Sequence, residues 1–359
     1  MKHRQVRINR VGIINPDGHV IGLDIGATAV RASILAAGTL DGRPSVTVHG
    51  IGQVELASGV VVKGEVREPD ALTAALRQLW TAHKFECRNV ILGVANPQVL
   101  VRDLSVPNID PGRRAKALPF QAKEVIALPI EEVVLDFSPL ETSADGETLH
   151  GLLIAAPRKP LLAMVHAVEQ AKLRVARVDL ASFGILRAIG GEQLTVEAVV
   201  DLGAHMTTIV IHDHGVPRLV RTLARGGDDL TANLAERLNI EVLEAETLKR
   251  QSGLDGANPE ANRALAESLR PLLAEIRTSI GYFRSSRNTA PIERISLTGG
   301  GANLSGLTQV MTDQTGLPAA VVDPLQHVRN RLASKEVRGA QFEGAPSAVA
   351  LGLAMGAAA

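Results

Sequence analysis

Short apolar runs alternate with longer stretches of helical periodicity along the first hundred residues. VIGLDIG (residues 20–26) is followed by VRASIL and SVTVHGIGQVEL, and this pattern predicts strands of one sheet. Three leucines recur at helical spacing over residues 68–83, which predicts a helix with Pro69 in its first turn. NVILGVAN (residues 89–96) predicts a buried strand.

The stretch over residues 101–157 has a different texture and predicts a small subdomain inserted into the first lobe. We expect a helix over residues 112–128, then strands over residues 129–140 and 149–157 that are separated by the turn TSADGET. A helix over residues 160–172 and the strand VARVDL follow.

The opening pattern then starts again in the second half of the chain. EAVVDLGAHMTTIVIHDHGVPRLVRTL repeats its order of apolar strand, Asp-x-Gly and second strand, and Asp24 and Asp201 lie 177 positions apart. Mostly helical segments follow over residues 228–250 and 261–286, and the chain closes with a helix of small apolar residues. We infer two duplicated α/β lobes with a cleft between them.

These patterns divide the chain into six parts. They are an N-terminal tail (1–19), a lobe 1 core (20–100), the inserted subdomain (101–174), a return to lobe 1 (175–196), a lobe 2 core (197–225 and 292–359) and a helical subdomain of lobe 2 (226–291).

Composition narrows the function classes. Apolar residues make up 45% of the chain and charged residues 21%, as in soluble globular proteins. Thirty-eight basic residues balance thirty-eight acidic ones, which disfavours nucleic-acid binding through net charge. Cys87 is the only cysteine, so disulfides and a cysteine-based zinc site are excluded. With no run of about 18 apolar residues, we expect a cytoplasmic protein.

The two Asp-x-Gly segments are the first candidates for chemistry. A glycine in the turn after a strand lets backbone N–H groups approach a phosphate, because no Cβ lies in the way. The aspartates, Asp24 and Asp201, would repel a phosphate unless Mg²⁺ or its waters lie between them. Two such hairpins, one from each half, predict a clamp on a nucleotide triphosphate. Either hairpin alone would more often be a structural turn.

A triple glycine is the third candidate. Gly299, Gly300 and Gly301 lie between a predicted strand and a helix, where flexible residues are costly unless something must lie against the backbone. A flat ring packed on this turn is one explanation, and a tight connection is the other. The sequence contains no Gly-x4-Gly-Lys-[Ser/Thr] motif, which disfavours a P-loop nucleotidase.

In this order, the three segments resemble the two phosphate loops and the adenosine loop of the actin, heat-shock chaperone and sugar-kinase superfamily. The chain resembles more closely the PilM family, the actin-like proteins of type IV pilus assembly. The similarity runs over residues 20–356, and PIEEVVLDF is its most distinctive string. VARVDLASFGILRA, AETLKRQ and EIRTSIGYFRSS also match. The resemblance implies an actin-like, ribonuclease-H-like duplicated fold with an inserted subdomain of the FtsA and PilM type.

The resemblance also implies an ATP and Mg²⁺ site between the lobes. Asp24 and Asp201 would hold the hydrated Mg²⁺. The nucleotide-binding residues would be Asp24, Gly26, Ala27, Thr28, Asp201, Gly203, Ala204, Thr207, Gly227, Glu246, Lys249, Gly299, Gly300, Gly301 and Asn303. From spacing alone, Glu246 and Lys249 would be an exposed helical salt bridge.

The loops depart from the family pattern. The first carries Ala27-Thr28-Ala29 and Arg31 where small hydroxyl residues and Lys are usual, and the second carries His205-Met206. Backbone donors survive such changes, so nucleotide binding is expected. Since no general base stands out in these motifs, slow or absent hydrolysis is expected.

The inserted subdomain bears on the partner. In the family, the N-terminal cytoplasmic peptide of PilN, an inner-membrane protein, docks in a groove beside this subdomain, and peptide capture in a groove is a recurring mode. The candidate groove residues are Leu104, Pro107, Phe120, Ile126 and Pro129, each of which could equally be subdomain core. Contacts with the pilus motor ATPase or platform, and self-association, stay open.

Two rival functions remain at this stage. A sugar or acetate kinase would use the same fold but needs a catalytic Asp and a polar acceptor site. An FtsA-type division protein would carry a C-terminal amphipathic membrane helix, whereas this chain ends in AMGAAA. His212-Asp213-His214 suggests a metal site, but its place in a predicted hairpin turn favours a solvated loop.

Overall fold

The computed structural model describes residues 19–40, 43–189, 195–286, 290–327, 329–330 and 347–358. The expected N-terminal tail lies outside the described residues except for His19, which begins the first strand.

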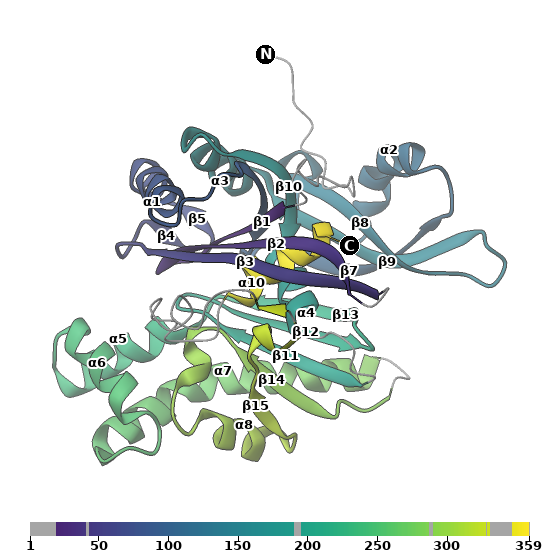
Figure 1. Ribbon diagram of the computed structural model, residues 1–359. Coiled ribbons are helices and arrows are strands. Elements are labelled where there is room, and N and C mark those ends of the chain that lie inside the picture. The colour runs from purple at the N-terminus through teal and green to yellow at the C-terminus, as the bar shows by residue number, and fades with distance from the viewer. Residues whose placement is uncertain are drawn as a thin grey trace.

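Two sheets with the same strand order form the two lobes (Figure 1). The lobe 1 sheet has the order β10 (Arg174–Leu180), β6 (Asn89–Val94), β1 (His19–Ile25), β2 (Ala29–Leu40), β3 (Arg43–Glu55) and β16 (Arg329–Asn330). The lobe 2 sheet has the order β15 (Ala319–Val321), β14 (Arg294–Thr298), β11 (Val196–Leu202), β12 (Thr207–Asp213) and β13 (Val216–Leu223). The central strands β1 and β11 are each parallel to one neighbour and antiparallel to the other, so the expected duplication is confirmed.

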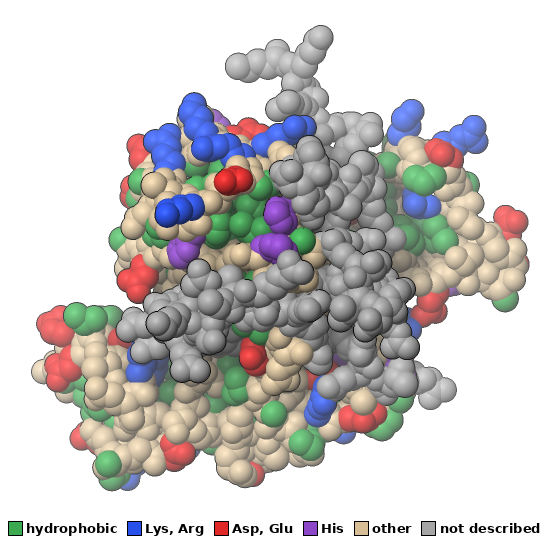
Figure 2. All heavy atoms as spheres, in the orientation of Figure 1, with side chains coloured by type: hydrophobic (Ala, Val, Ile, Leu, Met, Phe, Trp, Pro, Cys, Tyr) green, Lys and Arg blue, Asp and Glu red, His purple; other side chains and the backbone are tan. Residues whose placement is uncertain are grey.

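Helices cover both sheets and fill the space between them (Figure 1). α1 (Pro69–Ala82) and α3 (Arg158–Gln170) pack in the lobe 1 core, and Lys and Arg side chains gather over them at the upper left of Figure 2. α4 (Ala181–Ile189) and α10 (Ala348–Ala358) share a core with residues of both sheets. α5 (Gly227–Leu238), α6 (Val242–Ser252), α7 (Pro259–Ser286) and α8 (Leu307–Thr315) complete the lobe 2 core. Four small elements remain: β4 (Val61–Val62), β5 (Glu65–Val66), and the 3-10 turns η2 (Gly300–Asn303) and η3 (Pro324–His327).

Small residues allow α10 to lie very close to its neighbours. A Cβ on Gly352 would lie 1.7 Å from the Gly184 carbonyl oxygen of α4, and one on Gly22 of β1 would lie 2.0 Å from the Ala350 carbonyl oxygen. These close approaches explain why the last helix consists largely of Ala and Gly. The packed helix expected at this end of the sequence is therefore confirmed. In the described part of the chain, no helix has the length and apolarity that a membrane span needs.

The inserted subdomain is a three-stranded sheet with one helix. The strands β7 (Leu100–Pro107), β9 (Thr148–Pro157) and β8 (Val133–Thr142) pack their inner face on α2 (Pro111–Ala122), and the turn η1 (Ile130–Glu132) precedes β8. The expected range 101–174 also contained α3, but buried residues of α3 such as Met164 belong to the lobe 1 core. The compact subdomain therefore ends at β9.

The helix expected over residues 112–128 ends earlier, at Ala122. Its start is capped by Asp110, whose carboxylate accepts the N–H groups of Gly112 and Arg113. After Ala122 the chain turns, and Ile126 folds back into the subdomain core at 6% exposure. Tertiary burial of Ile126 therefore overrides the helical pattern.

The expectation of a solvated loop at His212-Asp213-His214 was wrong for His212. This residue lies on β12 and is fully buried, with Nε2 3.2 Å from Oε2 of the buried Glu197. Its Nδ1 accepts the N–H of Gly215, so Nε2 carries the proton that is donated to Glu197. Arg294 and Ser296 also donate to Glu197, and these hydrogen bonds satisfy a carboxylate that would otherwise be too costly to bury.

We predict that Gly352→Ala lowers the free energy of unfolding by about 3 kcal/mol, because the new methyl group forces α10 away from α4. Chemical denaturation followed by circular dichroism measures the change. Gly281→Ala is the matched control, since Gly281 lies in the C-terminal part of α7 with open space at its Cβ position. It should stabilise the protein by up to about 1 kcal/mol. Equal effects of the two variants would contradict the packing argument.

Candidate functional site

The two Asp-x-Gly segments form matching hairpins at the ends of the central strands. In lobe 1 the Gly26 N–H donates to the Ala29 carbonyl at 3.0 Å. In lobe 2 the Gly203 N–H donates to the Met206 carbonyl at 2.9 Å. The two turns consist of Gly26, Ala27, Thr28 and Ala29, and of Gly203, Ala204, His205 and Met206. Each aspartate is thus the second-to-last residue of its strand and lies just before a tight turn.

Asp24 is held from two directions. Its Oδ2 accepts a hydrogen bond from the Ser347 hydroxyl at 2.7 Å and lies 3.9 Å from Nη1 of Arg31. The Ser347 oxygen also accepts the Ala350 N–H at 3.0 Å, which caps the start of α10. The Asp24 side chain is 18% exposed, so it is deeply placed but still reachable from solvent.

The charges of Asp24 and Asp201 act on each other. Burial raises the pKa of Asp24, against the opposing effects of Arg31 and Ser347. Burial and, to a smaller extent, the nearby charge of Asp24 raise the pKa of Asp201 to about 7, although Arg31 acts in the opposite direction. The two half-buried carboxyl groups come from opposite lobes, and the charge of Asp24 disfavours the ionised form of Asp201. We call the region around these two carboxyl groups the crevice. A divalent cation would remove this conflict.

Arg31 brings a permanent positive charge to the crevice. It lies opposite Asp24 in the β1–β2 pairing, and its Nε donates to Oε1 of Gln53 at 2.8 Å. A Cβ on Gly26 would lie 3.2 Å from Nη1 of Arg31, so the guanidinium lies beside the first turn. The equivalent residue of lobe 2, opposite Asp201, is Thr208. Only the first hairpin therefore has an arginine at this register position.

The second hairpin packs directly on the start of α5. The N–H groups of Gly227 and Asp228 donate to the carbonyls of Gly203 and Ala204, both at 2.9 Å. A Cβ on Gly226 would lie 2.2 Å from the Ala204 carbonyl oxygen, which requires glycine there. The first turn of α5 therefore backs the second turn.

Side chains strengthen this contact. The Thr207 hydroxyl donates to the Arg225 carbonyl at 2.8 Å, and Thr207 is fully buried. Nε2 of His205 lies 3.0 Å from Oδ2 of Asp228, so the histidine of the second turn is also held by α5.

Glu246 and Lys249 join α6 to α5 and are more buried than an exposed helical pair would be. Lys249 is 11% exposed, and its ammonium contacts Oε2 of Glu246 at 2.6 Å, the Thr231 hydroxyl at 2.7 Å and the Gly227 carbonyl at 3.0 Å. Burial disfavours the charge of Glu246, but hydrogen bonds from Lys249, Thr231 and Arg250 outweigh it and lower its pKa. All three donors of Lys249 are engaged, and one of them holds the residue beside the second hairpin.

Each glycine of the triple-glycine turn has its own surroundings. Gly299 has φ +83°, and a Cβ there would lie 2.6 Å from Oδ1 of Asp201. A Cβ on Gly301 would lie 2.9 Å from the Leu202 side chain. Gly300 begins η2 with nothing within 4 Å of its Cβ position, and the Asn303 amide turns back to the Gly300 carbonyl. The turn thus packs against the end of β11 and keeps one open face.

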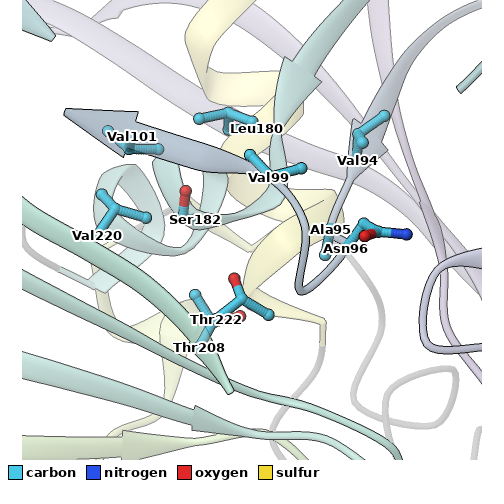
Figure 3. A pocket seen from close by; sticks show the side chains of 10 residues that line it. All are labelled: Val94, Ala95, Asn96, Val99, Val101, Leu180, Ser182, Thr208, Val220 and Thr222. Atoms are coloured by element: carbon cyan, nitrogen blue, oxygen red, sulfur yellow. The ribbon is translucent and has the colours of Figure 1, made fainter. Parts of the chain in front are cut away.

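A small cavity lies between the lobes (Figure 3). Its lining residues come from the end of β6 and the loop after it, from β7, β10 and α4, and from the lobe 2 strands β12 and β13. Thr208, the strand partner of Asp201, is among them, but none of the predicted nucleotide-binding residues is. The cavity is therefore distinct from the predicted site.

The predicted groove residues of the inserted subdomain differ in exposure. Phe120 on α2 is 72% exposed, Pro107 and Pro129 are exposed, Leu104 is half-buried, and Ile126 is buried in the core. Three further exposed apolar residues lie nearby in sequence: Ile109, Val125 and Leu128. An apolar surface is therefore present beside α2.

Comparison with known proteins decides the family. A family model described as type IV pilus assembly protein PilM matches residues 22–358. The chain belongs to the PilM family. A solved structure described as the PilM–PilN type IV pilus biogenesis complex is 29% identical, with a TM-score of 0.80 over 95% of this chain and 98% of that one. Type IV pilus assembly and an actin-like fold are thus properties of the PilM family to which the chain belongs.

More distant relatives agree with the fold of a PilM protein. The cell division protein FtsA of Bacillus subtilis is 24% identical over 267 residues, 65% of this chain and 58% of that protein. FtsA of Streptococcus pneumoniae is 22% identical over 265 residues, so the chain spans about half the length of these curated relatives. The MreB5 structure of Spiroplasma citri bound to AMPPNP has a TM-score of 0.51 at 13% identity, which supports the fold alone.

Sequence reasoning missed one residue of this region, Ser347. Its contact with Asp24 spans 323 positions, and the only local signal is a serine immediately before a helix, which predicts a cap. A cap signal does not say what else the hydroxyl touches.

We predict that the unliganded protein loses stability as the pH rises from about 4 to 7. The folded protein holds the Asp201 proton up to a pKa of about 7, whereas the unfolded chain releases it near the ordinary value of 3.8. Asp201→Asn removes this loss and should raise the free energy of unfolding at pH 8 by about 2 kcal/mol, with little effect below about pH 4.

Denaturant titrations at several pH values measure this difference. Asp136, whose pKa burial also raises to about 7, contributes equally to both proteins and cancels in the comparison. Parallel pH profiles for the variant and the wild type would contradict the placement of Asp201 in a charged crevice.

Proposed function

We propose that this PilM-family chain is a nucleotide-binding scaffold. Mg-ATP binds between the lobes at Asp24 and Asp201, and the inserted subdomain binds the N-terminal cytoplasmic peptide of a PilN-like inner-membrane protein. The observation that carries the nucleotide half is the pair of equivalent Asp-x-Gly hairpins in opposite lobes, close enough for the charge of Asp24 to act on Asp201.

The residues present fit a magnesium-bound triphosphate. Mg²⁺ usually binds through one or two carboxylates, its waters and phosphate oxygens, and it would supply the positive charge that Asp24 and Asp201 lack. The turns at Gly26 and Gly203 allow close approach of phosphate to the backbone, and Arg31 adds a cation beside the first turn. The set Ala27, Thr28, Ala204 and Thr207 completes the proposed phosphate site.

The proposed adenosine site lies at the open face of Gly300, between the triple-glycine turn and α6. Gly299, Gly301 and Asn303 shape this turn. Glu246 and Lys249 hold α6 against α5 at Gly227, so we assign them to the edge of the site, with the Glu246 carboxylate as the acceptor for a ribose hydroxyl.

The arrangement favours binding over rapid turnover. His205 is the one titratable side chain within the two turns, and its Nε2 is engaged by Asp228. The sugar-kinase alternative needs a polar acceptor site, whereas the subdomain beside the first lobe exposes Phe120 and other apolar residues. We therefore place the chain in pilus assembly as a scaffold, bound to the cytoplasmic face of the inner membrane through its partner.

For the peptide, we propose a docking surface centred on Phe120. The Phe120 side chain is 72% exposed, and exposure of an aromatic ring to water is unfavourable. A partner that covers the ring would therefore gain binding free energy from its burial. Leu104, Pro107 and Pro129 extend the surface, and the buried Ile126 supports it from below. The support for a PilN-like occupant is that the similar solved structure is a PilM–PilN complex.

We predict that Asp24→Asn and Asp201→Asn each weaken Mg-ATP binding by about 10-fold or more, because each removes a negative charge that faces the metal. Isothermal titration calorimetry measures the affinity with and without Mg²⁺, and circular dichroism checks the fold. Asp70→Asn, an exposed carboxylate in the first turn of α1, is the control and should leave binding unchanged. Wild-type affinity in both site variants would refute the assignment.

We predict that Phe120→Asp weakens capture of a PilN-like N-terminal peptide by about 10-fold or more, since a charged group replaces the apolar anchor. Fluorescence anisotropy of a labelled peptide measures the affinity. Leu243→Asp is the matched control because Leu243 on α6 is 79% exposed but lies in lobe 2. Leu104→Asp tests the same surface but also disturbs a half-buried residue. Loss of binding in the Leu243 variant alone would move the docking surface to lobe 2.

A further inference from the structure

The helices α1 and α3 end at the same edge of lobe 1. The Thr73 hydroxyl donates to the Ala167 carbonyl, and the Arg77 guanidinium donates to the Gln170 carbonyl at 2.8 Å, so the two helices run parallel. The strands that follow them, β6 and β10, also run parallel and begin side by side. The carboxyl ends of two helices and the amino ends of two strands therefore meet at one edge.

Basic side chains concentrate at this edge. We call it the basic edge; it consists of the exposed residues Arg77, Lys84, Arg88, Lys172 and Arg174. Two exposed acidic residues, Glu86 and Glu169, lie among them in sequence. Figure 2 shows the gathering of Lys and Arg over α1 and α3. Because the whole chain has as many acidic as basic residues, this edge is a local excess of positive charge.

Two of these lysines adopt a backbone conformation that favours glycine. Lys84 has φ +52° and Lys172 has φ +64°, and each follows the residue that caps its helix. Glycine is the usual residue at this position, because a Cβ disfavours the left-handed conformation. Two equivalent helix ends thus carry a lysine in a backbone conformation that favours glycine, at the end of the helix where the dipole favours a positive charge.

We propose that the basic edge docks on a bilayer surface that contains anionic phospholipid. Several Lys and Arg residues clustered on one face suit such a surface, and attraction acts within a Debye length of it. The nearest large aromatic rings, Trp80 and Phe85, are buried against each other at 5.5 Å, so the edge offers no stacking platform for single-stranded nucleic acid. Direct lipid contact goes beyond the proposed function, in which the partner alone links the chain to the membrane.

The test uses the purified full chain without nucleotide or peptide. Sedimentation with vesicles of phosphatidylcholine that contain about 30% phosphatidylglycerol should show binding, whereas pure phosphatidylcholine vesicles should not. About 0.5 M salt should abolish the binding. In the double variant Lys84→Gly/Lys172→Gly, the vesicle partition coefficient should fall about 30-fold, since each basic residue near the surface contributes a factor of about five.

The glycine variant separates charge from folding. It relieves the left-handed backbone at both positions, so its thermal midpoint should be equal to or above that of the wild type. Lys84→Arg/Lys172→Arg keeps the charge and should bind like the wild type. Arg263→Gln/Arg270→Gln removes two exposed charges from α7 of lobe 2 and should also bind normally.

Three results would overturn the proposal. They are no binding of the wild type to anionic vesicles, unchanged binding of the glycine variant, and equal loss in the α7 variant. Tighter binding to a single-stranded RNA oligonucleotide than to the vesicles, with loss in the glycine variant, would reassign the edge to nucleic acid. Nucleotide and peptide affinities do not enter this test, so its failure leaves the proposed function intact.

Discussion

The mutual repulsion of Asp24 and Asp201 is the constraint around which the lobes are arranged. Both carboxyl groups are half-buried at the ends of central strands. Burial raises both pKa values, and the like charge of Asp24 adds to the effect at Asp201. The fold compensates in part, through the Ser347 hydroxyl and the Arg31 guanidinium on the lobe 1 side. On the lobe 2 side, Gly299 permits the triple-glycine turn to pack against Asp201. A site that is destabilised when empty is one that a cation stabilises when bound.

The duplication could be predicted from the sequence because its signal is local. The order of strand, Asp-x-Gly and strand is repeated, and the two sheets have the same strand order in consequence. The partners of the site residues could not be predicted in this way. Ser347 reaches Asp24 across 323 positions, and the burial of Lys249 depends on the Gly227 carbonyl of another helix. Such contacts follow from how α10 and α6 pack, which no short pattern encodes.

His212 is a second residue whose environment could not be predicted from the local sequence. Three polar residues before a glycine are typical of a solvated turn, and the turn does follow at His214 and Gly215. His212 itself is buried because Glu197 lies opposite it on the neighbouring strand, with Arg294 on the far side of Glu197. Burial of a histidine of this kind depends on its tertiary partner. At the equivalent positions of the lobe 1 strands the residues are apolar, namely Val20 and Leu35.

The inserted subdomain contacts both lobes, and the nature of that contact determines what lobe movement can do to it. Arg218 of β13 pairs with Glu141 of β8 at 2.5 Å, but Glu141 is 54% exposed, and a solvated pair of this kind contributes little. The stronger contact is an apolar seam in which Ile154 of the subdomain, Leu180 of lobe 1 and Val220 of lobe 2 meet. Separation of these surfaces would expose apolar side chains to water, which is unfavourable. The subdomain is therefore tied to both lobes by apolar packing rather than by the exposed ion pair.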